Sequence, residues 1–479
     1  MYIFFLRFSF IMFVFLSSNA AFAQDKQTVY DSVAHLVQKT FNSDDPSKMY
    51  SLTDPTYRER MTAASFSDGT KKFSIKVGRW KDLKFMEQID GGMAYTAQFE
   101  RDTQIFFLQL DEQSRIVRFN FKAKPITKRN KNFQVQTDNQ LNTAIDILVE
   151  KLVRPYIQQE ITTGMCIAII QNGIVRRYSY GEVEKGNKKL PNPETTIFEI
   201  GSVTKTFTSL LLAKEVLRNK MNLKDAINKY LPDSIPSLRY KNTAITLQHL
   251  ANHTSGFPRL PANIFSGVVD PQDPYRHYNE DSLYSFLVRY NPSVMPGSLF
   301  SYSNFAAGLL ASILARSSHR TFEQLVITQI CRPLKMNDTR ISLSTKENTR
   351  FAKGYNEKGE ITAPWNLASL QGSGAIRSTL NDMIVYTRAQ LGQTTNPLAK
   401  AILLTHKPTF DSKDNTVGLG WRIAKDQTKS YLHHSGGTGG FRSFVGFNKN
   451  SQIGVVILSN AAEDVTTIGQ DLIENLSGK

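Results

Sequence analysis

A serine and a lysine, three residues apart, lie where a polar turn gives way to an apolar helix. The segment reads Phe-Glu-Ile-Gly-Ser-Val-Thr-Lys over residues 198–205, and a largely apolar stretch follows it. This spacing places Ser202 and Lys205 on the same face of a helix. A serine hydroxyl needs a base to become a nucleophile, and a lysine with a lowered pKa can serve as that base. The segment therefore predicts a Ser202 nucleophile partnered by Lys205.

A second group of polar residues follows a Pro-Gly turn at residues 296–297. Tyr302 and Asn304 stand in the loop that precedes a predicted helix over residues 305–315. A tyrosine in such a loop can relay the serine proton to the leaving group, and an asparagine amide can bind a substrate carbonyl. We therefore expect both side chains to face the serine.

A third segment combines histidines with glycines. It reads His-His-Ser-Gly-Gly-Thr-Gly-Gly over residues 433–440 and follows the apolar pair at 431–432. Glycines in a strand let its edge approach a bound substrate without obstruction. A backbone N–H from this strand, together with that of Ser202, would form an oxyanion hole. The alternative is an ordinary glycine-rich hairpin turn.

The order of the three segments resembles that of the class C β-lactamase-related serine hydrolases, which include D-Ala-D-Ala carboxypeptidases, D-aminopeptidases and esterases. Residues 245–256, 372–375 and 418–421 are also similar to that family, and the likeness covers about residues 137–476. It implies a β-lactamase/transpeptidase-like α+β fold, in which an antiparallel sheet is flanked by helices and joined to an all-helical subdomain. The chain order agrees, because strand-like segments lie at both ends of this region and helical segments lie between them.

The resemblance also implies a role for each matching residue. Ser202 would be the acylated nucleophile and Lys205 its proton partner. Tyr302 would be the second acid/base, and Asn304 would hold the substrate amide. Cofactors and metals are not implied by the resemblance.

The glycine-rich strand matches the Lys-Thr-Gly motif of lactamases with one departure. Gly436 and Gly437 would bind the substrate, and the Gly437 N–H would complete the oxyanion hole with that of Ser202. His434 stands where lactamases carry the lysine, so an imidazole that titrates near pH 6.5 replaces a permanent ammonium. The departure argues against efficient β-lactam hydrolysis and leaves peptidase, transesterase and esterase activity open.

The first part of the chain predicts an export signal and a separate module. Arg7 precedes an apolar run over residues 8–16 and an Ala-Phe-Ala cleavage pattern at 21–23. We expect residues 1–23 to be removed and the protein to be periplasmic or secreted; a retained anchor helix is the alternative. No later run is long and apolar enough to cross a membrane.

Residues 24–124 predict a small α+β accessory domain. Helical patterns come first, and strand-like runs follow over residues 73–80, 83–89, 93–99, 104–110 and 116–121. This order resembles the cone-shaped folds of the nuclear-transport-factor type, and it shows no catalytic constellation. We expect a basic linker at residues 125–136 and the hydrolase domain at 137–479.

The net positive charge of the chain limits the kinds of partner that the protein can bind. The 479 residues carry a formal charge of +16, and one basic cluster spans residues 122–131. Because an exported protein seldom meets nucleic acid, an anionic envelope polymer is the candidate partner of this cluster, and a merely solvated linker is the alternative.

His249 and His253 have helical spacing but lack the glutamate of a zinc motif. Cys166 and Cys331 leave a single disulfide undecided.

These observations predict an exported serine hydrolase that forms an acyl-enzyme on Ser202. The substrate would be an amide or ester of small-molecule or peptidoglycan type, such as a D-amino-acid peptide or a cell-envelope ester. Two alternatives remain at this stage. One is a non-catalytic, penicillin-binding-like envelope protein or sensor, and the other is a true β-lactamase.

Overall fold

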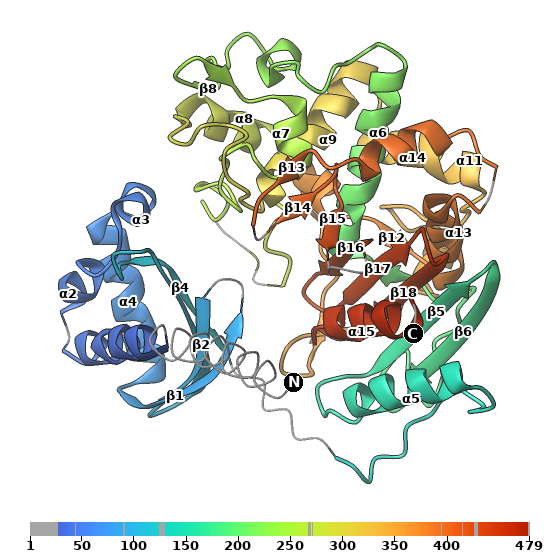
Figure 1. Cartoon of the computed structure of the whole chain (residues 1–479), viewed down its shortest axis with the longest axis horizontal. Helices are drawn as coiled ribbons and strands as arrows, with labels where there is room; N and C mark the ends of the chain where they lie inside the picture. Colours follow the sequence, from blue (N-terminus) through green and yellow to red (C-terminus); the bar gives the residue numbers. More distant parts are fainter. Residues whose placement is uncertain are drawn as a thin grey trace, which may run out of the picture. The chain divides into compact units, whose positions relative to one another are not determined.

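The computed structural model describes residues 27–477 except for 44, 90–91, 124–129, 267–269, 271, 394, 414 and 426–429. This part of the chain forms two compact units that divide between residues 126 and 127 (Figure 1). The predicted signal peptide and residues 125–129 of the predicted linker lie outside the described residues. None of the described helices combines the length and the apolar character that a membrane span requires.

The N-terminal unit places helices before an antiparallel sheet. Residues 27–41 are helical, and the elements that follow are α2 (Pro46–Tyr50), α3 (Pro55–Arg60), α4 (Ala63–Val77), β1 (Trp80–Ile89), β2 (Gly92–Phe99), β3 (Thr103–Leu110) and β4 (Ile116–Ala123). Each strand pairs with the next along the chain. The core is rich in aromatic rings, and Trp80 packs edge-on against Phe106 with ring centroids 5.1 Å apart.

The predicted strand over residues 73–80 is wrong, because α4 continues to Val77. Phe73, Ile75 and Val77 alternate as in a strand, yet Ile75 is 77% exposed. The residues that pack into the core are instead Phe66, Phe73 and Val77, whose spacing of seven and four residues is that of one helix face. The strand begins only at Trp80.

The second unit is built on an antiparallel sheet whose strands come from both the beginning and the end of the unit. In the described part of the chain it has eight strands in the order β13-β14-β15-β16-β17-β18-β5-β6. Their bounds are β5 (Gly164–Gln171), β6 (Ile174–Gly181), β13 (Phe410–Asp411), β14 (Thr416–Val417), β15 (Arg422–Lys425), β16 (Ser430–Gly437), β17 (Arg442–Asn448) and β18 (Ile453–Ser459). The hairpin from the start of the unit thus pairs with the strand near its end, as the sequence predicts.

Both faces of this sheet are covered, which explains the unbroken apolar run in β5. Met165, Ile167 and Ile169 belong to the core beneath α5 (Ala144–Ile157) and α15 (Thr466–Leu476). Their neighbours Cys166 and Ala168 point to the opposite core, which contains α6 (Thr204–Leu217) and α13 (Leu380–Leu391). A strand buried on both faces has no polar alternation to show.

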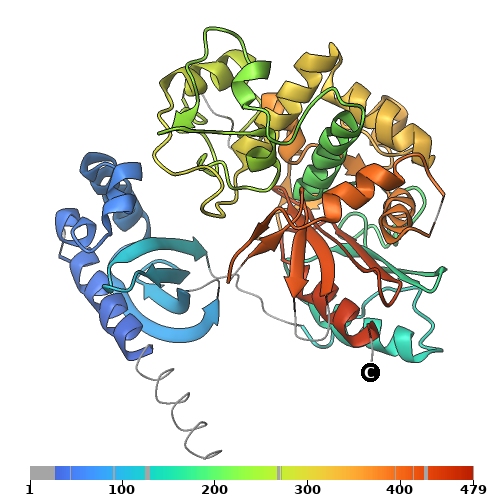
Figure 2. The ribbon, with the colours of Figure 1, turned by 45° about the horizontal axis from the view of Figure 1, so that its top comes forward.

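The remaining helices come from the part of the chain between β6 and β13. In Figure 2 they form the green to orange region above the red and teal strands. They are α7 (Leu247–Ala251), α8 (Glu280–Arg289), α9 (Asn304–Ser318), α10 (Phe322–Val326), α11 (Arg332–Leu334), α12 (Thr345–Asn348) and α14 (Ala399–His406). Short strands connect them: β7 (Phe198–Glu199), β8 (Arg239–Tyr240), β9 (Thr243–Ala244), β10 (Gly354–Tyr355), β11 (Ile361–Thr362) and β12 (Arg377–Ser378). Helices α6 and α9 begin beside each other, and these two helix starts carry the candidate site.

Candidate active site

The turn that carries Ser202 is held against strand β16. Ser202 lies in a short 3₁₀ turn (Gly201–Val203) between β7 and α6. Gly201 has a φ of +48°, and a Cβ there would lie 2.6 Å from the Gly437 nitrogen. The carbonyl of Ile200 accepts a hydrogen bond of 2.7 Å from the Ser443 hydroxyl on β17. Glycine is therefore required at 201 both by its backbone angle and by the close approach of β16.

Lys205 lies on the first turn of α6 and reaches the serine directly. Its Nζ is 3.0 Å from Ser202 Oγ, 2.8 Å from Asn304 Oδ1 and 2.6 Å from the Ser373 carbonyl oxygen. The side chain is only 2% exposed. Residues from three distant parts of the chain thus meet around one amine.

Burial lowers the pKa of Lys205 well below its usual value, and the positive charge of Arg259 lowers it further. Among the described residues, no carboxylate forms an ion pair with this amine, so no counter-charge offsets the cost of charging it. The lysine is therefore held toward its neutral form, in which nitrogen has a lone pair to accept a proton.

Tyr302 stands over the same amine. Lys205 Nζ lies 4.8 Å from the centroid of the Tyr302 ring, and the Arg259 guanidinium carbon lies 5.2 Å from it. Burial raises the pKa of Tyr302, whereas a hydrogen bond with Ser202 and the charges of Arg259 and Arg422 oppose that rise. The phenol is therefore protonated at neutral pH and is in contact with the serine.

His434 lies beside Tyr302, with the two ring centroids 6.2 Å apart. Its Nδ1 is 2.7 Å from the Ser435 carbonyl oxygen, so Nδ1 carries the ring proton in the neutral form. Burial and then the charge of Lys205 lower the pKa of His434 well below its usual value. The sequence suggested titration near pH 6.5; the buried position instead keeps this imidazole neutral through the physiological range.

The glycine segment forms a partly open strand edge next to Ser202. Strand β16 pairs with β17 as far as Gly437, but its pairing with β15 ends at His433 within the described residues. A Cβ on Gly436 would lie 2.1 Å from the Ile200 carbonyl oxygen, so no other residue fits there. The edge from 434 to 437 is thus left without a strand partner on the side where β15 stops.

Small cavities border the side chains of Ser202, Tyr302 and His434. One of about 30 Å³ is lined by Ser202, Leu260, Tyr275, Asn304, Trp365, Leu367, Leu370, Ser373, Gly374, Gly437 and Thr438. Another of about 10 Å³ is lined mainly by His253, Phe300, Tyr302, Trp421, Arg422 and His434. The nucleophile and the glycine edge therefore border the same cavity, while Tyr302 and His434 border its neighbour.

Sequence reasoning missed three contributors to the site. Arg259 and His253 contact Tyr302, and Ser373 offers its backbone carbonyl to Lys205. The stretches around His253 and Ser373 were noted for family likeness, but without a role. A backbone carbonyl leaves no side-chain signal in a sequence, and an arginine in a loop has no periodicity that would single it out.

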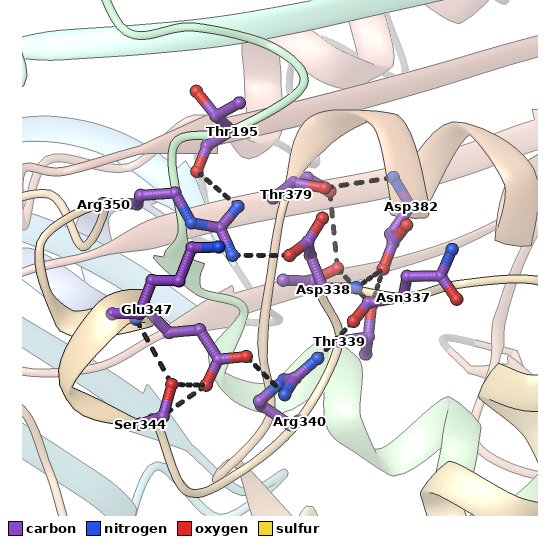
Figure 3. A network of polar contacts seen from close by, with 12 residues as sticks. Thr195, Asn337, Asp338, Thr339, Arg340, Ser344, Glu347, Arg350, Thr379 and Asp382 are labelled. Atoms are coloured by element: carbon purple, nitrogen blue, oxygen red, sulfur yellow. Dashed lines mark hydrogen bonds and ion pairs between the residues drawn. The ribbon is translucent and has the colours of Figure 1, made fainter.

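A polar network supports the strands that lead to Ser202 (Figure 3). Asp382 Oδ2 accepts from the Asp338 backbone N–H at 2.8 Å and from the Thr339 hydroxyl at 2.7 Å. Arg350 donates to Asp338 at 2.6 Å and to the Thr195 carbonyl at 3.3 Å. Because the Ile197 N–H also donates to the Arg350 carbonyl, the network holds the segment that enters β7.

Arg340 joins this network to the other side of β7. It forms an ion pair with Glu347, and its backbone exchanges hydrogen bonds with Arg377 at 3.0 and 2.7 Å. Arg377 lies on β12, pairs with Glu199 on β7 and forms a 3.2 Å ion pair with the Glu199 side chain. The strand that precedes the nucleophile is therefore held by the backbone and by charge.

The cysteines form no bridge in this structure. Cys166 and Cys331 are both free and buried. Burial raises the pKa of each thiol above its usual value, so neither is a reactive thiolate.

Comparisons with known proteins agree with the fold. Residues 149–473 match the sequence profile of the family described as Beta-lactamase. The β-lactamase of Escherichia coli (strain K12) is 28% identical over 351 residues, which cover 66% of this chain and 89% of that protein. The D-alanyl-D-alanine-carboxypeptidase/endopeptidase AmpH of the same strain is 29% identical over 336 residues, which cover 66% of this chain and 85% of AmpH.

Solved structures show the same architecture. A class C β-lactamase matches with a TM-score of 0.62 and 23% identity, covering 70% of this chain and 97% of its own. The β-lactamase/D-alanine carboxypeptidase from Pseudomonas syringae matches with a TM-score of 0.60 and 25% identity over 70% of this chain and 98% of its own. The predicted β-lactamase/transpeptidase-like α+β fold is confirmed. The chain belongs to the β-lactamase family and is a serine hydrolase.

Proposed function

We propose that this protein is an exported hydrolase that acylates Ser202 with an amide or ester substrate, with D-amino-acid peptides and cell-envelope esters as the substrate class. The observation that carries the proposal is the 3.0 Å contact between Nζ of the buried Lys205, whose pKa is lowered, and Oγ of Ser202. The relative AmpH, named as a D-alanyl-D-alanine carboxypeptidase/endopeptidase, supports the peptide part of this class.

The hydrogen bonds around Lys205 favour its action as a base. A neutral amine has two N–H groups and one lone pair. The carbonyl oxygens of Asn304 and Ser373 can only accept, so they take the two N–H groups. The lone pair then faces the Ser202 hydroxyl. On attack, the serine proton moves to Lys205 Nζ while the bond from Oγ to the substrate carbonyl carbon forms.

Tyr302 is the group suited to protonate the leaving group. Its raised pKa keeps the phenol protonated, and its contact with Ser202 places it beside the reacting carbonyl. When the bond to the leaving nitrogen or oxygen breaks, the Tyr302 phenol donates its proton to that atom. The proton on Lys205 Nζ then reprotonates Tyr302. Water, or another acceptor hydroxyl or amine, then attacks the acyl-enzyme, and the same groups act in reverse.

The strand edge and Asn304 complete the proposed substrate site. The N–H groups of Ser202 and Gly437 form the oxyanion hole, while Gly436 lets β16 approach the Ile200 carbonyl beside the nucleophile. Each such donor contributes roughly 2.7–4 kcal/mol to the transition state. His434 is neutral and cannot attract a carboxylate as an ammonium does. This favours esters and peptides over efficient β-lactam turnover.

The proposal is tested by covalent labelling. We expect the purified protein to bind a fluorophosphonate probe once per chain, with the mass increase on the peptide that contains Ser202. Ser202→Ala should abolish labelling, whereas Ser298→Ala, at an exposed serine of the 295–303 loop, should leave it intact. Unlabelled wild-type protein would refute the acyl-enzyme.

A substrate panel sharpens the same test. We expect kcat/KM to be highest for D-alanyl peptides or short-chain esters and lowest for a chromogenic cephalosporin. Labelling by a fluorescent β-lactam without turnover of any ester or peptide would favour the penicillin-binding-like sensor. Rapid cephalosporin turnover would favour the true β-lactamase.

The proposal includes the parts that precede the hydrolase. Residues 1–23 act as a cleaved signal, residues 24–124 as a nuclear-transport-factor-like accessory module, and residues 125–136 as a linker to the domain at 137–479. The helices-before-strands order of the N-terminal unit supports the second assignment. The basic linker remains the candidate contact with an anionic envelope polymer. The N-terminal residue of the exported protein tests the cleavage site directly.

A further inference from the structure

His253 occupies an unusual backbone position at the end of helix α7. Its φ is +61°, in the left-handed region that glycine and asparagine adopt most easily. His319 ends helix α9 with a similar φ of +53°, but that side chain is exposed. The His253 side chain is instead 6% exposed. The left-handed backbone thus turns this imidazole into the protein rather than toward solvent.

The residue binds the loop on both sides of Tyr302. The His253 carbonyl oxygen accepts from the Ser301 N–H at 2.8 Å, and its Nδ1 accepts from the Ser303 N–H at 3.2 Å. Its ring lies against the Tyr302 ring, with centroids 4.4 Å apart and planes 35° apart. The residues before and after the tyrosine, and the tyrosine ring itself, therefore all contact one histidine.

The remaining bonds of this loop reinforce the arrangement. The Ser303 hydroxyl donates to the Pro258 carbonyl at 2.7 Å, and the Asn304 N–H donates to the Arg259 carbonyl at 2.9 Å. Those bonds tie the start of α9 to the segment that follows His253. They do not involve the Tyr302 ring. Of the groups that lie against that ring, the His253 imidazole is the nearest, with centroids 4.4 Å apart, and Lys205, Arg259 and His434 lie farther from it.

We infer that His253 is a positioning residue that fixes the Tyr302 phenol for proton transfer to the leaving group. The inference rests on the proposed role of Tyr302. An amide N–H only donates, so Nδ1 must remain an unprotonated acceptor and the ring proton lies on Nε2. Burial, then the charges of Lys205 and His434, lower the pKa of His253 well below its usual value, which keeps Nδ1 free to accept.

A pair of esters separates positioning from general structural support. One ester has a p-nitrophenolate leaving group, which needs no proton, and the other has the same acyl group on an alkyl alcohol, which does. Displacement of a catalytic group by about 1 Å costs on the order of 100-fold. We expect His253→Phe to lower kcat/KM, which reports the acylation step alone, by about 100-fold on the alkyl ester and by much less on the p-nitrophenyl ester.

The acceptor atom is tested by conservative variants. Asparagine offers an oxygen near the position of Nδ1 and tolerates the left-handed backbone, so His253→Asn should recover most of the alkyl-ester activity. His253→Gln places its oxygen farther out and should not. His249→Asn is the matched control, since His249 Nδ1 also accepts an amide N–H, that of Thr246 at 3.2 Å, one turn earlier. It should leave the ratio of the two rates unchanged.

A double variant tests whether His253 acts through the tyrosine. Adding His253→Phe to Tyr302→Phe should cause no further loss on the alkyl ester, because the two residues act as one unit. All rates are normalised to the endpoint of fluorophosphonate titration, so only folded sites count. If His253→Phe does not fold, the contrast between His253→Asn and His253→Gln decides the question alone.

Two results would overturn the inference while leaving the proposed function intact. One is an equal loss on both esters in an enzyme whose Ser202→Ala variant is inactive. The other is alkyl-ester activity of His253→Asn no higher than that of His253→Gln. A wild-type protein that neither reacts with the fluorophosphonate nor hydrolyses either ester would instead overturn the proposed function, and this inference with it.

Discussion

Two buried polar regions of the hydrolase unit use charge in opposite ways. Around Lys205, the buried groups are an amine, a phenol and two imidazoles, and Arg259 adds a further positive charge. In the network behind β7, carboxylates and guanidinium groups alternate, and Arg340 pairs with Glu347 while Arg350 pairs with Asp338. Within the described residues, the first region has no carboxylate paired with its amine, and the second contains its own counter-charges.

The difference shows in the direction of the pKa shifts. Burial acts to raise the pKa of Glu347, yet hydrogen bonds from Ser344 and the charges of Arg340 and Arg350 bring it below its usual value. For Lys205 the charge of Arg259 acts in the same direction as burial, and its pKa falls. Counter-charges and hydrogen bonds therefore keep Glu347 ionised, although burial raises the pKa of Asp382 in the same network. Around Lys205, where the described residues offer no counter-charge, burial keeps the amine neutral and reactive.

The largest expected effect comes from removing the base. Lys205→Met should lower kcat/KM on an ester by about 10³- to 10⁴-fold, the upper part of the range of general acid–base catalysis. The free energy of unfolding should stay within about 1 kcal/mol of wild type, because a desolvated amine is removed while two acceptors lose a donor. Steady-state kinetics and urea denaturation measure the two quantities. A loss of activity under tenfold would contradict the role of Lys205.

The opposite outcome is expected in the network. Asp382 is 4% exposed and accepts from Asp338 and Thr339, so Asp382→Ala leaves buried donors unpaired. We expect a loss of about 3 kcal/mol in the free energy of unfolding and little change in kcat/KM per folded site. Asp233→Ala, at an exposed aspartate, is the control and should change stability by less than about 0.5 kcal/mol. Equal effects in the two variants would remove the distinction between the regions.

A smaller effect is expected at the edge of the network. Arg350→Met breaks a partly exposed ion pair with Asp338 and a bond to the Thr195 carbonyl. We expect a loss of about 1 kcal/mol in unfolding free energy, because solvent already screens part of the pair. Arg218→Met removes a more exposed arginine, which pairs with Glu215, and should cost less. The reverse ranking in denaturation experiments would show that burial does not govern these pairs.

The smallest effect is a shift in pH dependence. The charge of Arg259 lowers the pKa of Lys205, and activity requires the neutral amine. Arg259→Gln should therefore raise that pKa and move the acidic limb of the kcat/KM profile to higher pH. Arg289→Gln, at an exposed arginine of α8, should leave the limb in place. Because Arg259 is exposed, high salt should shift the wild-type limb in the same direction. A shift toward lower pH would contradict the charge argument.

Short motifs made much of the site predictable, because local geometry alone fixes the position of Lys205 relative to Ser202 and of Asn304 at the start of a helix. The contacts between motifs were accessible only through family likeness. The Ser373 carbonyl and the histidine that contacts Tyr302 come from loops whose placement depends on tertiary packing. The fold shows the same limit: strands were found from apolar runs bounded by turn residues, and residues 73–77 were misassigned because a helix face there coincides with an alternating pattern.

The pairing of β5 with β18 sets an order on assembly. Leu458 on β18 lies opposite Cys166 on β5, although the ribosome makes these residues almost 300 positions apart. Until β18 emerges, the β5–β6 hairpin presents a bare hydrogen-bonding edge, and such distant pairings form slowly. A nascent chain that ends before residue 453 therefore lacks the strand that pairs with β5. We expect premature termination to yield an aggregation-prone fragment rather than a less active enzyme.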